Sequence, residues 1–210
     1  MEQQNNLQPI QNEALFRIPY GLYLLSARCD GRDNACIINA AQLVTDQPKC
    51  LAVTVNKRNF THDMIQNTGI FNLSVLTEQT PFSVFEQFGF RSGRDGVDKF
   101  TPGEEAQRTQ NWLRYLPSVS NAVISCEVVN TLDCGTHTLF LSQVVLAKVL
   151  SGQPSATYDY YQKRIKPQPQ PKEKKGWVCK VCGYVYEGEE LPPDFICPWC
   201  KHGAADFERL

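Results

Sequence analysis

This 210-residue sequence lacks several features that would assign it to a protein class at once. No stretch reaches 18 uninterrupted apolar residues, so we expect no membrane-spanning helix and no membrane partner. The first six residues are polar and no apolar run follows them, so we expect no signal peptide and a cytoplasmic protein. The sequence has no internal repeat and no G-x-G-x-x-G motif, and the missing motif argues against a doubly wound dinucleotide-binding fold.

Acidic and basic residues nearly balance, with a net charge of −1, but residues 161–175 are strongly basic. They hold six Lys and Arg against one Glu, and no aromatic residue lies in the core of the stretch at 166–175. We therefore expect a solvated linker and no nucleic-acid partner. Proline alternates with polar residues after Lys166, which is typical of extended polyproline II, and ten such residues would reach roughly 30 Å. The sequence thus predicts a large domain at 1–160, a tether at 161–175 and a small domain at 176–210.

The large domain is predicted to be mainly β. Apolar and polar residues alternate at 51–55, 70–76 and 137–150, as expected for strands with one buried face. Mostly strands with few helices favour a β-barrel.

Two short helices are expected between these strands. The first would have Thr61 as its N-cap and Gly69 as its stop. The second would begin at Thr80, with Pro81 at its first helical position, and Gly89 would follow its last turn.

The nine cysteines are unevenly distributed. Five are single, and by default we expect them to be small buried apolar side chains. The other four form two C-x-x-C pairs, and in a chain without an export signal such pairs indicate a metal site rather than disulfides. Four thiolates make a tetrahedral soft-ligand site suited to zinc or iron, here Cys179, Cys182, Cys197 and Cys200.

The sequence around these pairs resembles rubredoxins. Residues 177–186 are similar to the opening of that family, and residues 191–200 and 206–208 are similar to its ending. The stretch between the pairs is shorter, like the module at the end of rubrerythrins, and Lys201 stands where the second loop usually has glycine. The resemblance implies one mononuclear iron per chain, with a zinc ribbon as the alternative. The aromatic residues expected in its core are Trp177, Tyr184, Phe195 and Phe207.

In the large domain, residues 56–61 join a strand end to a helix start. Backbone N–H groups there, together with the Thr61 hydroxyl and a nearby cation, suit a phosphate. The alternative is an ordinary threonine cap with exposed Lys and Arg.

Five separated segments of this domain resemble the flavin reductase family and occur in family order. They are residues 34–45, 56–61, 69–76, 92–100 and 134–140, whereas residues 101–121 match poorly. The resemblance implies an FMN-binding split β-barrel that is usually dimeric, so we expect a homodimer.

The same resemblance implies roles for single residues. The isoalloxazine ring of FMN would lie along Asn34, Cys36, Ile37 and Asn39, its ribityl phosphate would be held by Asn56, Lys57, Asn59 and Thr61, and Lys99 would approach from its loop. His137 would be the catalytic residue near the face where nicotinamide stacks, although Thr136 replaces the usual Asp. A histidine satisfied inside the core is the alternative for His137, and packing beside the ring is the alternative for Cys36.

The order of the two domains resembles that of high-molecular-weight rubredoxins. A nicotinamide delivers two electrons as hydride and a thiolate-ligated iron accepts one at a time, so a flavin is the natural converter. We therefore expect an NAD(P)H-dependent electron-transfer flavoprotein. The resemblance implies as acceptor a flavodiiron protein, which reduces oxygen or nitric oxide, or a rubrerythrin-like protein.

Two other functions remain open at this point. The chain could be a flavin or ferric reductase with an accessory metal domain, or a binding protein whose zinc ribbon docks a flavin domain onto a partner. The sequence does not distinguish NADH from NADPH.

Overall fold

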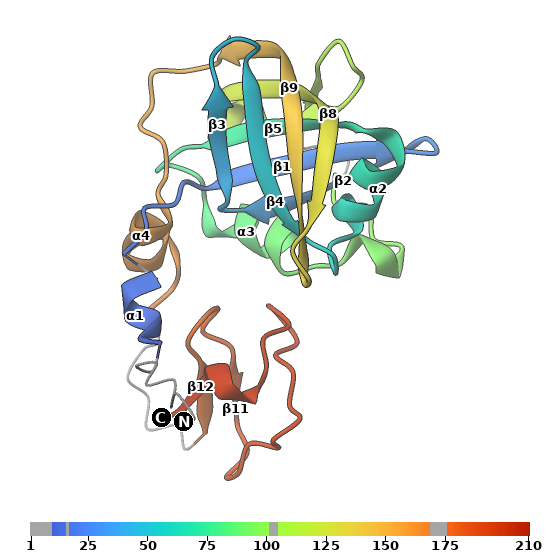
Figure 1. Cartoon of the computed structure of the whole chain (residues 1–210). Coiled ribbons are helices and arrows are strands. Elements are labelled where there is room, and N and C mark those ends of the chain that lie inside the picture. Colours follow the sequence, from blue (N-terminus) through green and yellow to red (C-terminus); the bar gives the residue numbers. More distant parts are fainter. Residues whose placement is uncertain (1–9, 16, 101–104, 169–175) are drawn as a thin grey trace, which may run out of the picture.

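The computed structural model describes residues 10–15, 17–100, 105–168 and 176–210. A seven-stranded antiparallel sheet of order β2-β1-β5-β8-β9-β4-β3 dominates the large domain, with β2 and β3 as its edges. The sheet curls so that β1 and β5 cross the direction of β3, β4, β8 and β9 (Figure 1). The predicted mainly β split barrel is therefore confirmed. The strands are β1 (Tyr23–Cys29), β2 (Arg32–Ile38), β3 (Ala41–Thr45), β4 (Cys50–Asn56), β5 (Ile70–Leu76), β8 (Ser120–Asp133) and β9 (His137–Val149).

The alternating pattern of the sequence gives the barrel its interior. All three strands expected from alternation are present, because β4, β5 and β9 cover the predicted ranges to within a residue. Val53, Val55, Phe71 and Phe140 are fully buried in the main core cluster. Burying an apolar side chain of this size contributes about 1.5–3 kcal/mol, so these positions hold the barrel together.

Helices cover the sheet at two places. Helix α2 (Phe60–Thr68) packs against β1 and β2, and α3 (Phe82–Gly89) packs against β2. Phe85 and Phe88 of α3 enter a second core cluster. The remaining elements of the large domain are α1 (Asn12–Leu15), α4 (Tyr158–Tyr160) with the π-helical turn Tyr161–Ile165, the 3-10 turns Gly93–Asp95 and Pro117–Val119, and the hairpin of β6 (Gln107–Arg108) and β7 (Arg114–Tyr115).

The expected N-cap of α2 is wrong. The cap position is Asn59, and Thr61 lies inside the first turn, where it is fully buried and accepts a hydrogen bond from Asn34 Nδ2 at 2.8 Å. Its hydroxyl thus satisfies an interior amide instead of the helix end. The predicted stop is confirmed, because Gly69 has a φ of 71° and its N–H donates to the Ile65 carbonyl at 2.8 Å. This left-handed conformation favours glycine.

Helix α3 is shifted by one residue from its predicted bounds. Pro81 is its N-cap, so the first helical residue is Phe82, and Gly89 is the last helical residue rather than the one after it. Differences of this size are common at helix ends, which fray.

The five single cysteines do not all behave as expected. Cys36, Cys50 and Cys126 are buried, as predicted, but Cys29 is half-buried and Cys134 is exposed. Cys29 ends β1 and Cys134 lies in the turn after β8, where the chain reaches solvent.

The small domain is a three-stranded sheet, in the order β11 (Val185–Tyr186), β10 (Trp177–Cys179) and β12 (Phe207–Arg209). The 3-10 turn Ala204–Asp206 leads directly into β12. All four predicted aromatic residues join its core, which forms around the cysteines. Three aromatic rings lie close together, with Phe195 at 4.8 Å from Tyr186 and 5.3 Å from Phe207 between ring centroids. The core is therefore largely made of rings and sulfur.

Part of the predicted tether is ordered against the barrel. Residues 158–165 are helical, and Tyr161 packs on Phe85 with ring centroids 4.5 Å apart. Residues 169–175, the centre of the expected polyproline segment, lie outside the described residues. Within the described part of the chain, no helix is both long and apolar enough to cross a membrane.

Candidate functional site

The four predicted metal ligands converge in the small domain. Their sulfur atoms all lie within 4.8 Å of one another, with 3.6 Å between Cys179 and Cys200 and 3.4 Å between Cys182 and Cys197. A tetrahedral ion with metal–sulfur bonds of about 2.3 Å requires sulfur atoms about 3.8 Å apart. The arrangement therefore fits a four-thiolate metal with little rearrangement.

Backbone N–H groups surround these sulfur atoms. Tyr184 donates to Cys182, His202 donates to Cys200, and Trp199 and Cys200 donate to Cys197. The hydrogen bond from Cys200 lowers the pKa of Cys182, whereas the shared proton and burial raise the pKa of Cys200. Four thiols packed this closely cannot all ionise unless a cation compensates them, which is the environment expected of a metal site.

The two cysteine loops are similar in their backbone. The N–H of Gly183 donates to the Cys179 carbonyl at 2.8 Å, and the N–H of Lys201 donates to the Cys197 carbonyl at 2.9 Å. Both residues are left-handed, with φ of 79° and 64°. Lys201 therefore adopts the conformation of the missing glycine, and the second loop keeps its N–H bond to sulfur through His202.

In the barrel, the loop before α2 is held by its own backbone and by one arginine. The Asn59 N–H donates to the Asn56 carbonyl at 3.0 Å, and the Arg58 N–H donates to Asn56 Oδ1 at 2.9 Å. Arg94 donates to the carbonyls of Lys57 and Arg58 and pairs with Asp63 at 2.7 Å. The loop thus presents a fixed turn, a helix start and several cations.

Asn34 has an unpaired atom at the same place. Its Nδ2 binds Thr61, but its Oδ1 is buried without a hydrogen-bond partner among the described residues. A Cβ at Gly93 would lie 2.4 Å from this oxygen, so only a glycine can approach the Asn34 amide this closely. A buried acceptor without a partner among the described residues fits a polar group bound beside it, such as the ribityl chain of a flavin.

Cys36 and Lys99 lie next to this pair. Cys36 is hydrogen-bonded to Thr61 and close enough to Lys99 for the two to interact, and burial raises the pKa of its thiol. Lys99 is only 3% exposed, and its ammonium donates to the carbonyls of Ala35 at 2.9 Å and Phe88 at 3.1 Å. Burial lowers the pKa of Lys99. The structure therefore brings Asn34, Cys36, Thr61 and Lys99 together.

His137 stands directly opposite Asn56 on adjacent strands, so it borders the same loop. Its Nδ1 lies 2.8 Å from Thr136 Oγ1, and partial burial lowers the pKa of its imidazole. Lys57 forms an ion pair with Asp133 at 2.6 Å across this edge. Two residues predicted to line the isoalloxazine ring lie farther along the chain. Ile37 is in β2 and faces α3 at Gly89, and Asn39 directly follows the end of β2.

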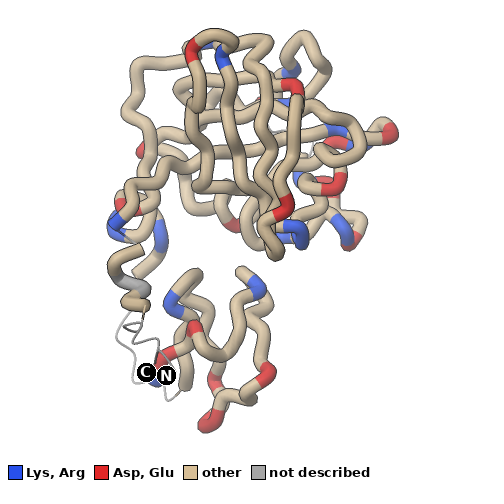
Figure 2. The backbone as a smooth tube through the Cα atoms, in the orientation of Figure 1, with Lys and Arg blue, Asp and Glu red and all other residues tan. Residues whose placement is uncertain are grey.

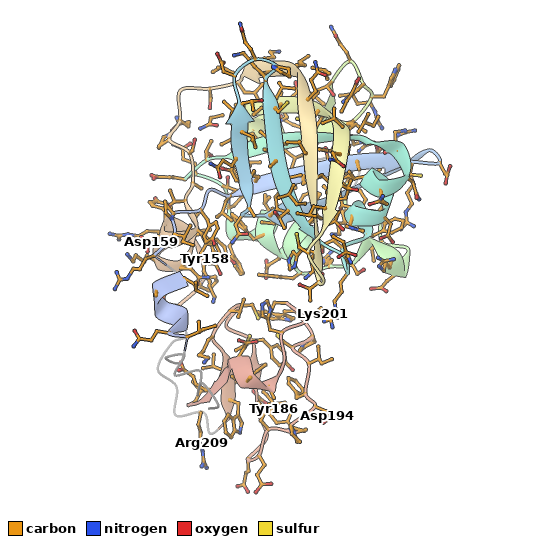
Figure 3. All side chains as sticks on the ribbon, in the orientation of Figure 1. Tyr158, Asp159, Tyr186, Asp194, Lys201 and Arg209 are labelled. Atoms are coloured by element: carbon orange, nitrogen blue, oxygen red, sulfur yellow. The ribbon has the colours of Figure 1, made fainter. Side chains whose placement is uncertain are left out.

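The small domain lies below this edge of the barrel, with its cysteine loops toward it (Figure 1). The Trp199 ring stacks on Phe90, with centroids 5.8 Å apart and planes inclined by 16°. Arg58 donates to the Lys201 carbonyl at 3.1 Å, and Lys201 points toward the barrel while Asp194 and Arg209 lie away from it (Figure 3). The chain thus places the metal ligands beside the loop that precedes α2.

Sequence reasoning assigned no role to three residues at this junction. Arg58 and Arg94 lay inside segments that resemble the flavin reductases, and each makes contacts that local sequence cannot show. Phe90 carries a weak signal, because it is an aromatic residue directly after a helix end, and here it packs on Phe82 of α3 as well as on Trp199 of the small domain.

Comparisons with known proteins match the two ends of the chain to different families. The model of the flavin reductase like domain matches residues 15–168, and that of the rubrerythrin, rubredoxin-like domain matches residues 177–208. The chain is 32% identical to the high molecular weight rubredoxin of Moorella thermoacetica, over 96% of this chain and 100% of that protein. It is 37% identical to the ferric-chelate reductase (NAD(P)H) of Archaeoglobus fulgidus, over 71% of this chain and 88% of that one.

A solved structure supports the fold. An FMN-binding protein from Thermus thermophilus is 20% identical, with a TM-score of 0.61 that covers 90% of this chain and 92% of that one. At this identity the likeness concerns the fold alone.

Proposed function

The chain belongs to the flavin reductase family and ends in a rubredoxin-like domain, and from this premise we propose that it passes electrons from NADH or NADPH to an acceptor protein, by way of one FMN and one iron. The family and its ferric-chelate reductase relative make it an NAD(P)H-dependent oxidoreductase with a flavin site and a four-cysteine iron site. The proposal also includes FMN, rather than FAD, as the flavin, and it includes the identity of the acceptor protein.

Bound flavin and iron would supply the redox chemistry, in which a flavin takes electrons in pairs and the iron takes them singly. The residues of the chain bind and orient these groups. Asn34, Thr61 and Gly93 would form the cradle for the ribityl chain, and Lys57 with the loop backbone would hold the phosphate. His137 would line the nicotinamide side of the site, neutral at physiological pH because burial lowers its pKa.

The single observation that carries the proposal is the junction between the domains. Arg58 belongs to the proposed phosphate loop, and its partner Lys201 follows the ligand Cys200 directly. An iron held at the cysteines would therefore lie next to the flavin-binding edge of the barrel. A binding module or an accessory domain would not need its metal ligands at this edge.

The charge of the junction supports a phosphate there. Lys and Arg lie on both sides of it, whereas the acidic residues of the small domain lie mostly along the part of its backbone that is far from the barrel (Figure 2). Cations that face each other repel unless an anion lies between them, and the phosphate of FMN would provide it.

The acceptor we propose is a flavodiiron protein that reduces oxygen or nitric oxide, or a rubrerythrin-like protein. In this structure the metal end of the small domain faces the barrel, so an acceptor needs the domain to turn away before it can approach. The acidic far side would then help to steer a partner with a basic surface, and high salt would slow that encounter.

The test uses the full chain loaded with FMN and iron. Cys197→Ala removes one ligand and should abolish rapid reduction of the acceptor, while reduction of the flavin by NAD(P)H stays near its normal rate. Cys126→Ala is the matched control, because it removes a buried thiol from the barrel core instead. Acceptor reduction at full rate by a Cys197→Ala protein shown to lack iron would mean that the flavin donates directly.

One alternative has its own support. The chain is 37% identical to the ferric-chelate reductase over 71% of its length, so a ferric reductase with an accessory metal domain is the second candidate. In that case ferric chelates would be reduced equally well by the intact chain and by Cys197→Ala.

We also propose a homodimer in the cytoplasm. Several large apolar side chains on β3, β8 and β9 are exposed in the single chain: Leu43, Val44, Val129, Leu132, Val145 and Val149. Large exposed apolar side chains gathered on one sheet are typical of an interface. Light scattering coupled to size-exclusion chromatography would measure the mass, and a monomer at micromolar concentration would contradict the dimer.

A further inference from the structure

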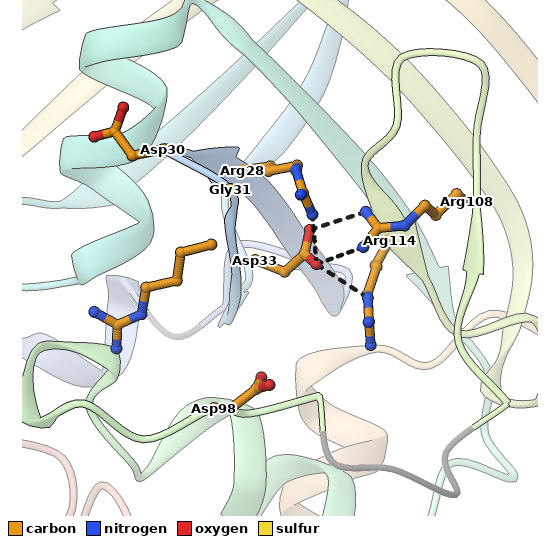
Figure 4. Close-up of a pocket in the computed structure, with 8 residues that line it drawn as sticks. Arg28, Asp30, Gly31, Asp33, Asp98, Arg108 and Arg114 are labelled. Atoms are coloured by element: carbon orange, nitrogen blue, oxygen red, sulfur yellow. Dashed lines mark hydrogen bonds and ion pairs between the residues drawn. The ribbon is translucent and has the colours of Figure 1, made fainter.

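A cavity separate from the loop at 56–61 lies beside the β1–β2 hairpin. This cavity has a volume of about 560 Å³ and is wide open to solvent. Seven charged side chains line it together with Gly31 (Figure 4): Arg28, Asp30, Arg32, Asp33, Asp98, Arg108 and Arg114.

Asp33 is the centre of this cavity wall. Its carboxylate accepts from Arg28 at 2.9 Å, from Arg108 at 2.6 and 3.0 Å, and from Arg114 at 3.1 Å. Burial alone would raise the pKa of Asp33, but the hydrogen bonds from Arg108 and Arg28 outweigh it and hold the pKa below its ordinary value. Three guanidinium groups therefore surround one carboxylate, which leaves two positive charges uncompensated at this point.

The full wall mixes donors and acceptors. Asp30 and Asp98 add two carboxylates and Arg32 adds a fourth guanidinium, so the lining as a whole carries one net positive charge. Guanidinium groups match phosphate oxygens in geometry, and carboxylates accept from hydroxyl groups. A phosphorylated sugar offers both partners, whereas a simple anion would gain nothing from the carboxylates.

An exposed aromatic ring stands on the β6–β7 hairpin, which also carries Arg108 and Arg114. Trp112 lies in the turn between β6 and β7, and its carbonyl accepts a hydrogen bond from Arg108. Its side chain is 71% exposed and its φ is 64°. A bulky residue in the left-handed region is strained, and strain of this kind is concentrated at functional sites. An exposed indole is a stacking platform for a purine base.

From this combination we propose that the cavity binds the adenosine diphosphate half of the nicotinamide dinucleotide. Arg108 and Arg114 hold the diphosphate, the carboxylates accept from ribose hydroxyls, and Trp112 stacks on adenine. The proposal rests on the oxidation of NAD(P)H by the barrel and adds to it the part of the substrate that does not react.

The cavity and the flavin-binding residues are connected through neighbouring residues of the chain. Asp33 precedes Asn34 in β2, and Asp98 precedes Lys99. Arg32 donates to the carbonyl of Gly93, the glycine that borders Asn34, and lies over the Phe60 ring at 4.8 Å. Arg32 therefore links the two sites, because it lines the cavity and also contacts residues that border Asn34 and Thr61.

The experiment compares NADH with reduced nicotinamide mononucleotide, which lacks the adenosine monophosphate half, using the chain loaded with FMN and iron. Arg108→Met and Trp112→Ala should each raise the KM for NADH about tenfold or more, which is the loss expected for one charge-assisted hydrogen bond or one stacked base. The KM for the mononucleotide should change much less. Arg209→Met, which removes an exposed guanidinium from β12, is the matched control and should change neither value.

A calorimetric titration with ADP-ribose gives a readout that needs no turnover, and both variants should weaken its binding by the same factor. If Arg108→Met does not fold, Trp112→Ala still tests the proposal, because removing an exposed ring leaves the hydrophobic core intact. Equal KM shifts for both substrates, or unchanged ADP-ribose binding, would overturn the proposal. Weaker binding of FAD with an unchanged KM for NADH would also overturn it and assign the cavity to the flavin. Failure of the wild-type chain to oxidise either nucleotide would refute the proposed function instead.

Discussion

Lys201 offers a direct test of how the metal loops are built. Gly183 and Lys201 occupy equivalent positions, with the same N–H bond to the carbonyl of the first cysteine of each pair and the same left-handed backbone. Only glycine adopts this conformation without strain, which costs other residues about 1–2 kcal/mol. Lys201→Gly should remove that strain, while the more flexible unfolded chain would offset roughly 0.5–1 kcal/mol of the gain. The expected net stabilisation of the small domain is about 0.5–1 kcal/mol.

The assay is the loss of iron to a chelator, followed by the ferric–thiolate absorbance. Because about 1.4 kcal/mol corresponds to a factor of ten, Lys201→Gly should slow iron loss by about two- to fivefold. The docking bond from Arg58 is made to the carbonyl of residue 201, so it survives the substitution. Gly183→Ala is the matched opposite and should accelerate iron loss, because it adds the same strain and brings a Cβ within 3.3 Å of Lys166. If Lys201→Gly loses iron as fast as the wild type or faster, the strain argument is wrong.

Three further predictions concern the barrel and its junction. Lys57→Ala should weaken FMN binding by about 10- to 100-fold in a fluorescence titration, whereas Lys49→Ala, another exposed lysine paired with an aspartate, should have no effect. Phe90→Ala should remove about 0.5–1.5 kcal/mol of docking energy, and small-angle scattering should then show a larger radius of gyration; an unchanged radius would contradict a docked domain held by this stack. Asp33→Asn should cost about 1.5–3 kcal/mol of unfolding free energy at pH 7. Because the pKa of Asp33 is lowered by folding, its contribution is present above about pH 4 and is lost as the pH falls through the folded pKa, so wild type and variant should converge in acid denaturation.

The sequence predicted those features that depend on local pattern. Alternation located β4, β5 and β9, and the C-x-x-C spacing identified all four ligands, because both signals are carried by residues close together in the chain. The position of Thr61 was misjudged for the opposite reason. Threonine before an apolar helix face is a good cap, but here its hydroxyl serves an asparagine 27 residues earlier. A hydrogen-bond partner so far away in the sequence decides what a side chain does, and it produces no pattern in the residues next to that side chain.

The arginine cavity and the domain junction were missed on the same grounds. Arg108 and Asp33 are 75 residues apart, and Arg58 and Lys201 are 143 residues apart. The poor family match at 101–121 was the one available signal, because a stretch that departs from its relatives can carry a property of its own. The structure places a charged hairpin with an exposed tryptophan there.

The small contact between the domains is itself consistent with a relay. The Phe90–Trp199 stack and the hydrogen bonds from Arg58 and Lys166 to carbonyls of the small domain contribute about 0.5–1.5 kcal/mol each. Together they do not much exceed the roughly 4 kcal/mol that corresponds to a millimolar dissociation constant between separate molecules. A short tether raises the effective concentration of the small domain into the millimolar range, so such a weak contact can still be formed for part of the time. A tighter contact would keep the metal end of the small domain covered and inaccessible to the acceptor. Without the tether, the barrel and the small domain would be separate molecules and would seldom meet. The tether therefore makes a strong contact between the two domains unnecessary. The small domain can receive electrons at the barrel and can also leave the barrel.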